Sequence, residues 1–459
     1  HKRRPIFNRI KVIRQSLNKK ILVAYSFPAL AISIPTIPLY LYLPTFYGVT
    51  LELGLAATGF ALLTARVFDT ITDPIVGIIS DRFPIKRNYR KPWIAVGSII
   101  AAIGLYQLLN PPNDAGIIYL ICWSIILYLG WTFVAVPYLT WGAELSTDYN
   151  ERTSITTSRE TAGILGILTC GVIFTFSANL NFSEIDTIGI IGWATIGLGA
   201  ISIPYMLKKV PDAGLVRLKK GKNTNSSFLR SVLQLTQNRL FVRLLAAWFL
   251  NGIANGIPSV LFFLYLDKVL GVNETQRAVL ILIYFSTAVA AMPAWLSLSK
   301  VFNKHRVWCY AMILAIGAFS LVPFLPEGAF YLFSIICILT GVCLGADLSI
   351  PPSIQADVLD YDKLKTRSQR AGLLFSLWGM ATKLALACSV GLAFPLLDWL
   401  GFEPDMPDDS GRQALVFLYA LLPVGFKCIT VLAIWNFPLN RKNHTIIKRR
   451  LYGPPAPTN

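Results

Sequence analysis

Charged residues are scarce in this chain. Only 14% of its 459 residues are charged, while 54% are hydrophobic. A soluble protein of this size carries about 25% charged residues. Too few polar side chains are present to cover a surface that faces water, so the composition excludes a soluble protein and predicts that most of the surface faces lipid.

Residues that commonly carry chemistry are also few. The three histidines lie in polar segments and form no ligand cluster, and the seven cysteines lie in apolar runs without paired spacing. We therefore expect the cysteines to be buried hydrophobic residues, not disulfides or metal ligands. The sequence contains no nucleophile–base constellation, metal motif or phosphate loop. It predicts neither an enzyme nor a bound cofactor.

What the chain does have is positive charge, with a net charge of +18. A nucleic-acid-binding protein gathers its Lys and Arg on one folded face. Here they occur in short segments between long apolar runs, which is the distribution of a membrane protein. We expect a lipid bilayer, and not nucleic acid, as the environment, with a small molecule as the ligand.

Long apolar runs account for most of the sequence. A membrane-spanning helix needs about 20 mainly apolar residues. Runs of this kind lie at about 21–47, 53–80, 92–110, 115–141, 161–180, 187–207, 244–266, 278–299, 307–326, 328–350, 371–397 and 413–436. They predict an all-α integral membrane protein with twelve transmembrane helices.

The basic residues predict the orientation of these helices. With the N-terminus placed inside, 35 of the 42 Lys and Arg residues lie on the inner side, and only Lys268, Arg277 and Arg412 lie outside. Cytoplasmic loops are rich in Lys and Arg. The first twenty residues are basic and lack a signal-peptide cleavage site. Both termini are therefore predicted to be cytoplasmic, in an inner or plasma membrane.

The longest predicted cytoplasmic segment divides the chain into two six-helix halves. The expected units are a tail 1–20, a half 21–207, a linker 208–240, a half 241–436 and a tail 437–459. Similar charged segments follow the fourth and tenth runs, Asp148-Tyr149 in one and Asp360-Tyr361 in the other. Matching positions in the halves indicate parallel repeats, the layout of the major facilitator superfamily.

The second run carries three charges on one helix face. Arg66, Asp69 and Asp73 stand at i, i+3 and i+7. Ionisable groups at membrane depth are costly and usually face a bundle interior or an aqueous cavity. Two carboxylates beside an arginine can bind a hard cation or exchange a proton. A buried structural ion network is the alternative that the sequence leaves open.

Further polar residues lie inside the later runs. Lys383 is too far from either end of its run to reach the interface, so we expect it to pair with the carboxylates of the second run. Lys427 has no clear partner. Asn251 and Asn255 are one helical turn apart and either bind substrate hydroxyls or bond across helices.

Several motifs in order resemble the glycoside–pentoside–hexuronide:cation symporters, the group that contains melibiose permease. The resemblance covers nearly the whole chain. It rests on Arg66-x-x-Asp69-x-x-x-Asp73-Pro74, Asp81-Arg82 with Arg90-Lys91-Pro92-Trp93, Val136-Pro137-Tyr138, Gly142-Ala143-Glu144-Leu145, Asp148-Tyr149-x-Glu151-Arg152-Thr153, Asn251-Gly252 and Ala356-Asp357-Val358-x-Asp360-Tyr361.

The resemblance implies a cation-coupled symporter of a small polar solute, with a sugar or glycoside as the leading substrate. It places the cation at Asp69 and Asp73, with Thr72 beside them and the hydroxyl of Thr132 as a further ligand. These two carboxylates would bind the transported metal ion if the ion is sodium. Thr72 stands where melibiose permease has an amide, so sodium and proton coupling both stay open.

The substrate positions depart from the sugar pattern. Sugar-transporting relatives have acidic residues at the positions that match Ser33 and Ala135, and their aromatic platform matches Leu139. The substrate candidates are Arg159, Lys383, Asn251, Asn255, Ser33 and Trp131. A lysolipid transporter is the second hypothesis, and a membrane receptor or scaffold without transport is the third.

Charged segments at the predicted cytoplasmic ends of the halves suggest an inner gate in a monomeric transporter. Opposite charges across this seam would favour the state that is open to the outside. One exposed pair contributes about 0–1 kcal/mol, so a network is required. The gate candidates are Asp81, Glu144, Asp148, Glu151, Arg152, Asp357, Asp360 and Arg370.

Overall fold

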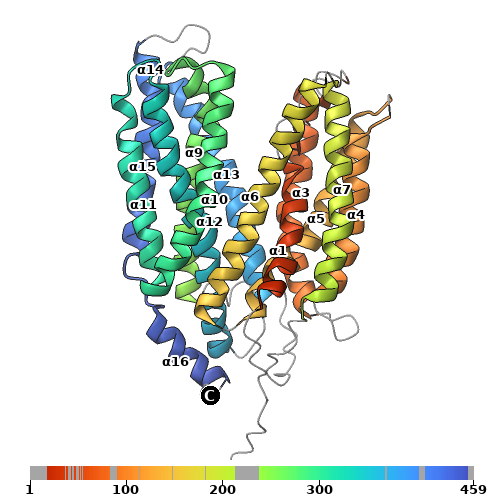
Figure 1. Ribbon diagram of the computed structural model, residues 1–459, viewed down its shortest axis with the longest axis vertical. Helices are drawn as coiled ribbons and strands as arrows, with labels where there is room; N and C mark the ends of the chain where they lie inside the picture. The colour runs from red at the N-terminus through yellow and green to blue at the C-terminus, as the bar shows by residue number, and fades with distance from the viewer. Residues whose placement is uncertain are drawn as a thin grey trace, which may run out of the picture.

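The computed structural model of the chain is a bundle of long helices (Figure 1). It describes residues 18–36, 38–39, 43, 46–47, 51, 53, 55–82, 90–112, 114–146, 148–180, 182–211, 237–366, 370–402 and 409–452, and these contain no strand. The α-helices are α1 (Lys19–Ser33), α3 (Leu55–Arg82), α4 (Lys91–Leu109), α5 (Ile117–Leu145), α6 (Tyr149–Asn179), α7 (Glu184–Lys209), α9 (Arg239–Lys268), α10 (Glu274–Val301), α11 (Lys304–Ser320), α12 (Phe330–Thr366), α13 (Ala371–Trp399), α14 (Asp409–Val416), α15 (Leu422–Ile434) and α16 (Arg441–Tyr452).

Nine helical segments of the described residues are long and apolar enough to cross a membrane. They coincide with nine of the predicted runs. The other three runs contain α1, α3 and α6. Buried charges on α3 and polar first turns on α6 lower the apolarity of two of these helices. The all-helical membrane class is therefore confirmed, while the number of twelve crossings stays a prediction.

Two helices extend well beyond their apolar runs. α6 begins at Tyr149, before the predicted start at 161, and α12 continues to Thr366, past the predicted end at 350. These charged stretches were predicted to lie between the membrane-spanning helices, but they are parts of the helices themselves. Apolar runs mark only the part of a helix that lies in hydrocarbon, whereas the polar ends of α6 and α12 are helical as well.

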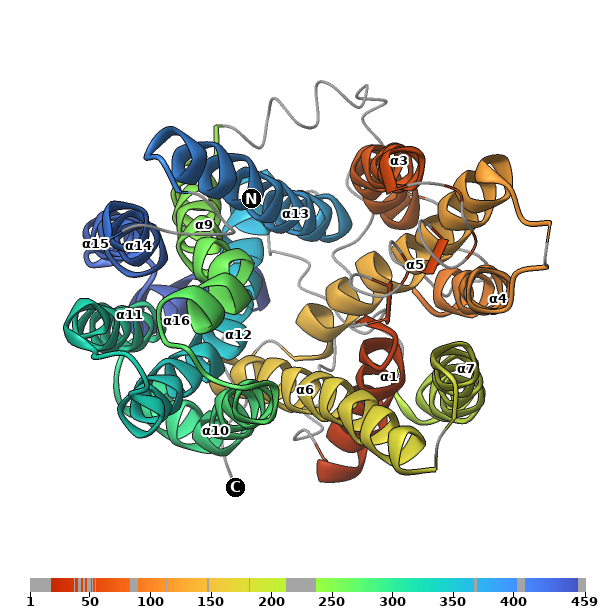
Figure 2. The ribbon, with the colours of Figure 1, turned by 90° about the horizontal axis from the view of Figure 1, so that it is seen from above.

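The helices form two groups, which Figure 2 shows from above: α1 and α3–α7 in one, α9–α15 in the other, with α6 beside α10 and α12 at the boundary. Small residues let backbones approach closely inside a group. Gly97 of α4 and Gly130 of α5 face each other so closely that a Cβ on either would overlap the other helix.

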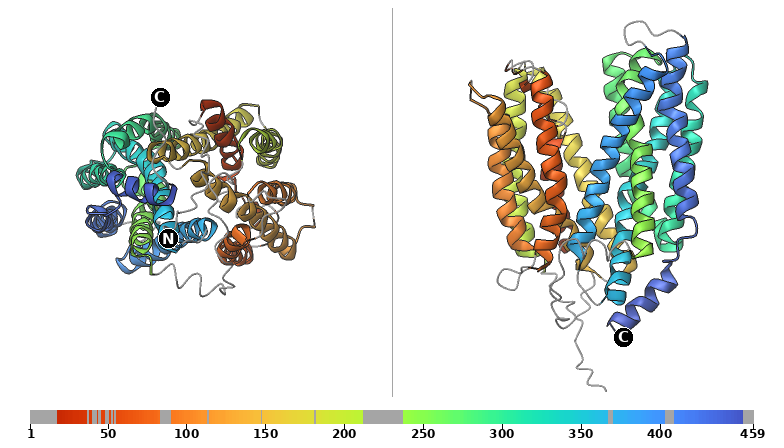
Figure 3. Two further views of the ribbon diagram at one scale, coloured as in Figure 1. Left: turned by 90° about the horizontal axis from the view of Figure 1, so that it is seen from below. Right: turned by 180° about the vertical axis from the view of Figure 1, so that it is seen from behind.

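The two groups converge towards the end that carries α16 and diverge towards the opposite end (Figure 3). On the convergent side α3 meets α13, where a Cβ on Gly77 or on Gly372 would overlap the main-chain oxygen of the other. The domain boundaries stay predictions. Much of the predicted tails and of the linker 208–240 lies outside the described residues, namely 1–17, 212–236 and 453–459.

Candidate functional site

The charged face of α3 is buried in the bundle. Asp69 and Asp73 retain only 1% and 4% of their accessible surface. They stand near the middle of α3, as their positions between Leu55 and Arg82 require. Because isolated carboxylates at this depth are costly, partners from neighbouring helices must compensate them.

Thr132 of α5 and Lys383 of α13 supply those partners. The Thr132 hydroxyl lies 3.1 Å from Oδ1 of Asp69 and 3.0 Å from Oδ1 of Asp73. The ammonium of Lys383 lies 2.7 Å from Oδ2 of each carboxylate. Three helices thus converge on one cluster, and Lys383 reaches it from the other half of the bundle.

The cluster has the donors of a monovalent cation site. Four carboxylate oxygens and one hydroxyl are hard ligands, and the Lys383 ammonium already occupies the position between the carboxylates where a cation would bind. A lysine and a metal ion cannot share that position without strong repulsion. No group of three His, Cys, Asp or Glu residues in the described part of the chain forms a conventional metal site.

Arg66 and Thr72 stand at the margin of this cluster. The guanidinium of Arg66 lies 3.7 Å from Asp69 and 4.4 Å from the ring centre of Tyr128. The Thr72 hydroxyl donates to the main-chain oxygen of Asp69 at 3.0 Å. Thr72 thus bonds its own helix here, and Arg66 partly balances the negative charge.

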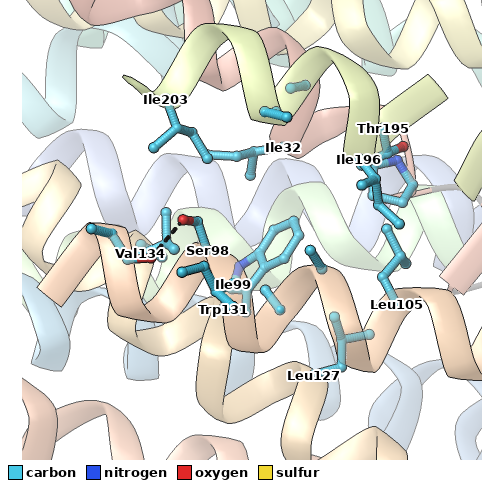
Figure 4. A pocket seen from close by; sticks show the side chains of 18 of the residues that line it. Ile32, Ser98, Ile99, Leu105, Leu127, Trp131, Val134, Thr195, Ile196 and Ile203 are labelled. Carbon is cyan, nitrogen blue, oxygen red and sulfur yellow. Dashed lines mark hydrogen bonds between the residues drawn. The ribbon is translucent and has the colours of Figure 1, made fainter. Parts of the chain in front are cut away.

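The remaining substrate candidates are not gathered around these carboxylates. Arg159 is buried and contacts Glu160. Ser33 packs α1 against Gly163 and Gly166 of α6. Trp131 lines an apolar cavity (Figure 4), whereas the neighbouring Thr132 contacts the two carboxylates.

That cavity holds about 390 Å³ and is lined by α1, α4, α5 and α7. Ala135 is among its lining residues, so the position of a sugar-type acid in the fourth helix faces an apolar space. The two lining hydroxyls donate within their own helices, Ser98 to Ala95 at 2.9 Å and Thr195 to Ile191 at 2.8 Å. The cavity therefore suits an apolar occupant.

A second buried network contains Asn251, Asn255 and Lys427. The Lys427 ammonium donates to the amide oxygens of Asn251 at 3.0 Å and Asn255 at 2.8 Å. Asn255 donates in turn to Asp347 at 2.9 Å, and Trp308 donates to the other oxygen of Asp347 at 2.7 Å. Here the asparagines bond across helices, and Lys427 has the partners that the sequence did not reveal.

Five of the eight gate candidates form two clusters on the convergent side. In the first, Arg152 of α6 lies 3.2 Å from Asp357 and 2.7 Å from Asp360 of α12. Lys304 reaches Asp357 at 2.6 Å, and His444 of α16 reaches Asp360 at 3.0 Å. Lys304 and His444 were not among the predicted gate residues, since neither lies near the others in the chain.

In the second cluster, Arg90 lies 2.7 Å from Asp81 and 2.9 Å from Glu144. Asp81 also accepts the main-chain N–H of Gly372 at 2.9 Å and of Leu373 at 3.2 Å. α3 is thus tied to the first turn of α13, in the other half. Arg90 was not among the predicted gate residues.

The other three candidates, Arg370, Glu151 and Asp148, lie outside these two clusters. Arg370 pairs with Asp362 at 3.1 Å, and Glu151 accepts from Ser146. Asp148 accepts the N–H groups of Asn150 and Glu151 at the start of α6. Burial acts to raise the pKa of Asp148, but these bonds and nearby Lys448 outweigh it, so the pKa lies below its ordinary value.

Comparison with known proteins agrees with this architecture. The profile of the MFS/sugar transport protein family matches residues 24–441. An uncharacterized symporter of Synechocystis sp. is 24% identical over 92% of this chain and 94% of its own length. The sodium-dependent lysophosphatidylcholine symporter 1-A of Danio rerio is 24% identical over 96% of this chain and 91% of its own.

Other similarities are more partial or more distant. The lactose permease of Lactobacillus delbrueckii subsp. bulgaricus is 25% identical over 72% of this chain and 54% of its own. A bacterial homologue of the iron transporter ferroportin superposes with a TM-score of 0.69 at 12% identity, covering 91% of this chain and 98% of its own. A proton:xylose symporter gives a TM-score of 0.65 at 12% identity, over 92% and 96%. The predicted major facilitator fold is confirmed.

Proposed function

Since this chain belongs to the MFS/sugar transport protein family, we propose that it is a symporter that uses Asp69, Asp73 and Thr132 to bind the driving cation. It is a multi-pass membrane transporter and not an enzyme, in line with its relatives. The observation that carries the proposal is the Lys383 ammonium at 2.7 Å from both carboxylates, with a hydroxyl beside them. Membrane-buried carboxylates of this kind mark ion or proton pathways.

The geometry supports a displacement mechanism. In the cation-free state, Lys383 neutralises one of the two buried negative charges. A sodium ion between the carboxylates would repel the Lys383 ammonium at short range. A proton would instead neutralise one carboxylate and so weaken its attraction for the ammonium. Lys383 belongs to α13 and the carboxylates to α3. Cation binding would thus loosen one contact between the halves and free an ammonium for the substrate.

The substrate is proposed to be a small polar solute, with a sugar or glycoside as the first candidate. The family profile and the lactose permease support this class. Arg159 and Lys383 would be its charged contacts. Asn251 and Asn255 would contribute only if the Lys427 network opens.

A lysolipid is an equally well supported second candidate. The sodium-dependent lysophosphatidylcholine symporters match most of the chain. Ser33 and Ala135, at the positions of the acidic residues in sugar-transporting relatives, are both neutral. Relatives of both kinds favour a cargo with a polar group. The acidic residues with which sugar-transporting relatives bind their sugar are absent here, and a lysolipid would not require them.

We further propose that the two halves rock about the central site. The clusters around Arg152 and Asp81 would close the cytoplasmic side, with both termini on that side of an inner or plasma membrane. The units 21–207 and 241–436 would move as the two bodies, in a monomer.

Uptake into proteoliposomes tests the proposal. Purified protein is assayed with labelled sugars and labelled lysophosphatidylcholine, under an imposed sodium gradient or an imposed proton gradient. Wild type should accumulate one cargo class under one gradient, and Asp73→Asn should lose the gradient dependence. Asp362→Asn, which alters a buried carboxylate outside the cation cluster and the substrate candidates, is the matched control and should keep it.

Undiminished gradient-driven uptake by Asp73→Asn would rule out this cation site. Competition between the two labelled cargos separates the sugar and lysolipid candidates. If correctly inserted protein accumulates neither cargo under either gradient, the result would favour the receptor or scaffold hypothesis.

A further inference from the structure

The apolar cavity beside Trp131 is open at the side of the bundle. α4 and α7 touch at one end, where Tyr106 and Trp193 lie with ring centres 5.4 Å apart and Leu109 packs on Gly192. Further along, the cavity lies between the two helices, with Ser98 and Ile99 of α4 and Ile203 of α7 among its lining residues. Ile99, which lines the cavity, keeps 62% of its surface exposed. The cavity is therefore a fissure that opens outward between α4 and α7.

The surroundings of the fissure define what can enter it. α4 and α7 are both apolar enough to span a membrane, so the fissure opens into hydrocarbon and not into water. Its hydroxyls are already bonded within their helices. Figure 4 shows aliphatic side chains such as Ile32 and Ile203 facing the indole of Trp131 across the space. These hydroxyls have no free O–H left to donate to a polar solute, and the rest of the named lining is aliphatic or aromatic.

The length of the fissure matches one leaflet. Its α7 wall runs from Thr195 to Leu207, which corresponds to a rise of about 18 Å at about 1.5 Å per residue. The hydrocarbon of one leaflet is about 15 Å deep, half of the usual core. An acyl chain that lies along α7 would therefore fill the fissure from the interface to the bilayer centre.

Charge at the inner end adds a headgroup preference. Lys208 and Lys209 directly follow Leu207 in the last turn of α7 and are exposed. The distribution of basic residues predicts this end to be cytoplasmic. Lysines at this position attract anionic lipids of the inner leaflet.

We propose that the fissure between α4 and α7 is a binding site for a resident anionic phospholipid, with an acyl chain against Trp131 and the phosphate near Lys208 and Lys209. The lining comes from α1, α4, α5 and α7, all in one half of the bundle. Walls within one half do not part when the halves rock, so the occupant is a lipid of the bilayer and not the cargo. The site thus goes beyond the proposed transport function and does not depend on it.

Thr132 and Trp131 are adjacent on α5, and they face the cation cluster and the fissure respectively. An acyl chain in the fissure would therefore pack against the α5 face that carries Trp131. The lipid thereby acts as a structural ligand of the helix that contributes the hydroxyl to the cation site.

Native mass spectrometry of the full-length protein tests the site. The protein is titrated with dioleoyl phosphatidylglycerol or dioleoyl phosphatidylcholine, and retained lipids are counted. Gly199 lines the fissure, and a Cβ there meets open space. Gly199→Leu should therefore fill it and lose one tightly retained lipid of either kind. Gly197→Leu, also in open space but outside the lining, should retain it.

A second variant, Ala102→Leu on the facing helix α4, should also fill the fissure and lose the lipid. It provides an independent test in case Gly199→Leu misfolds. Lys208→Gln with Lys209→Gln should keep the lipid but lower the preference for phosphatidylglycerol, by up to about 30-fold for two lysines near a membrane surface. Lys300→Gln with Lys442→Gln removes two exposed charges elsewhere and should leave the preference unchanged.

Several results would overturn the proposal. Equal lipid retention by wild type and both filled variants would show that no chain occupies the fissure. Mole-for-mole displacement of phosphatidylglycerol by lysophosphatidylcholine would assign the space to cargo. A shift from dimer to monomer in the filled variants would assign it to a second copy of the chain.

Discussion

Arg152→Gln should open the cytoplasmic side of the transporter. Arg152 keeps only 2% of its side-chain surface and contacts Asp357 at 3.2 Å and Asp360 at 2.7 Å across the two halves. It also donates to the main-chain oxygen of Ala356 at 2.8 Å. These contacts exist only while the halves meet on this side. Removing the guanidinium therefore penalises the closed arrangement alone.

The magnitude follows from burial. Removing one partner of a buried ion pair costs about 3–5 kcal/mol. Lys304 and His444 remain beside the two carboxylates, which places the loss at the lower end. About 3 kcal/mol corresponds to a change of roughly a hundredfold in the ratio of the two states. Turnover should slow because the transporter dwells in one state.

The assay measures the accessibility of a cysteine at position 139. Leu139 of α5 packs against the core of the other half, and rocking would uncover it. In a background without the exposed Cys122 and Cys428, Leu139→Cys is labelled in inside-out vesicles with a membrane-impermeant maleimide. Arg152→Gln should label much faster than the parent.

Arg370→Gln is the matched control. Arg370 is also buried and paired, at 3.1 Å from Asp362, but both residues belong to the same half. It should lower thermal stability without changing the labelling rate. Equal labelling of Arg152→Gln and its parent, or equal acceleration by both variants, would refute the gate and leave these charges to fix topology.

Three further predictions concern other parts of the chain. Lys383→Ala should impair transport while the protein still inserts, because the variant lacks the ammonium that lies 2.7 Å from Asp69 and from Asp73. Normal uptake kinetics in this variant would show that Lys383 has only a packing role. Asp148→Ala should destabilise the protein by about 1 kcal/mol as a lost cap, and Asp148→Asn, which keeps a capping oxygen but not the charge, should lose less. Because the pKa of Asp148 is lowered in the fold, the advantage of wild type over Asp148→Asn is present above about pH 4 and is lost as the pH falls through the folded pKa, which thermal melts at several pH values can check. Tags at residue 220 and at the C-terminus should be reachable only from the cytoplasm, and labelling of either from outside intact cells would reverse the predicted orientation.

The sequence predicted that Lys383 lies beside Asp69 and Asp73, because the spacing of the two carboxylates is local. Asp69 and Asp73 share a helix face in any helix, and charge at membrane depth demands a partner. Lys383 was identified as that partner for the same reason, because it is a charged residue in the middle of an apolar run. The position of Thr132 came only from the resemblance, since a hydroxyl inside a membrane helix carries no energetic signal of its own.

Contacts set by tertiary packing were beyond such reasoning. Lys427 had no visible partner because the asparagines that hold it lie on a helix distant in sequence. His444 lies on α16, a polar helix after the last apolar run, and nothing in its neighbourhood predicts that it docks beside Asp360. The fissure between α4 and α7 is likewise invisible in sequence, because residues that line a gap are as apolar as residues that fill one.

The bond from Asp81 to the first turn of α13 has a consequence for genetics. Its acceptor is a side chain, but its donors are the main-chain N–H groups of Gly372 and Leu373. Any substitution at those positions short of proline keeps the donors, and a side chain at Gly372 would collide with Gly77 and Asp81. A loss of Asp81 therefore has no compensating charge reversal on α13. Suppressor screens should recover paired changes for Arg152, whose partners are carboxylates, but for Asp81 they should recover only reversion or changes elsewhere in the protein.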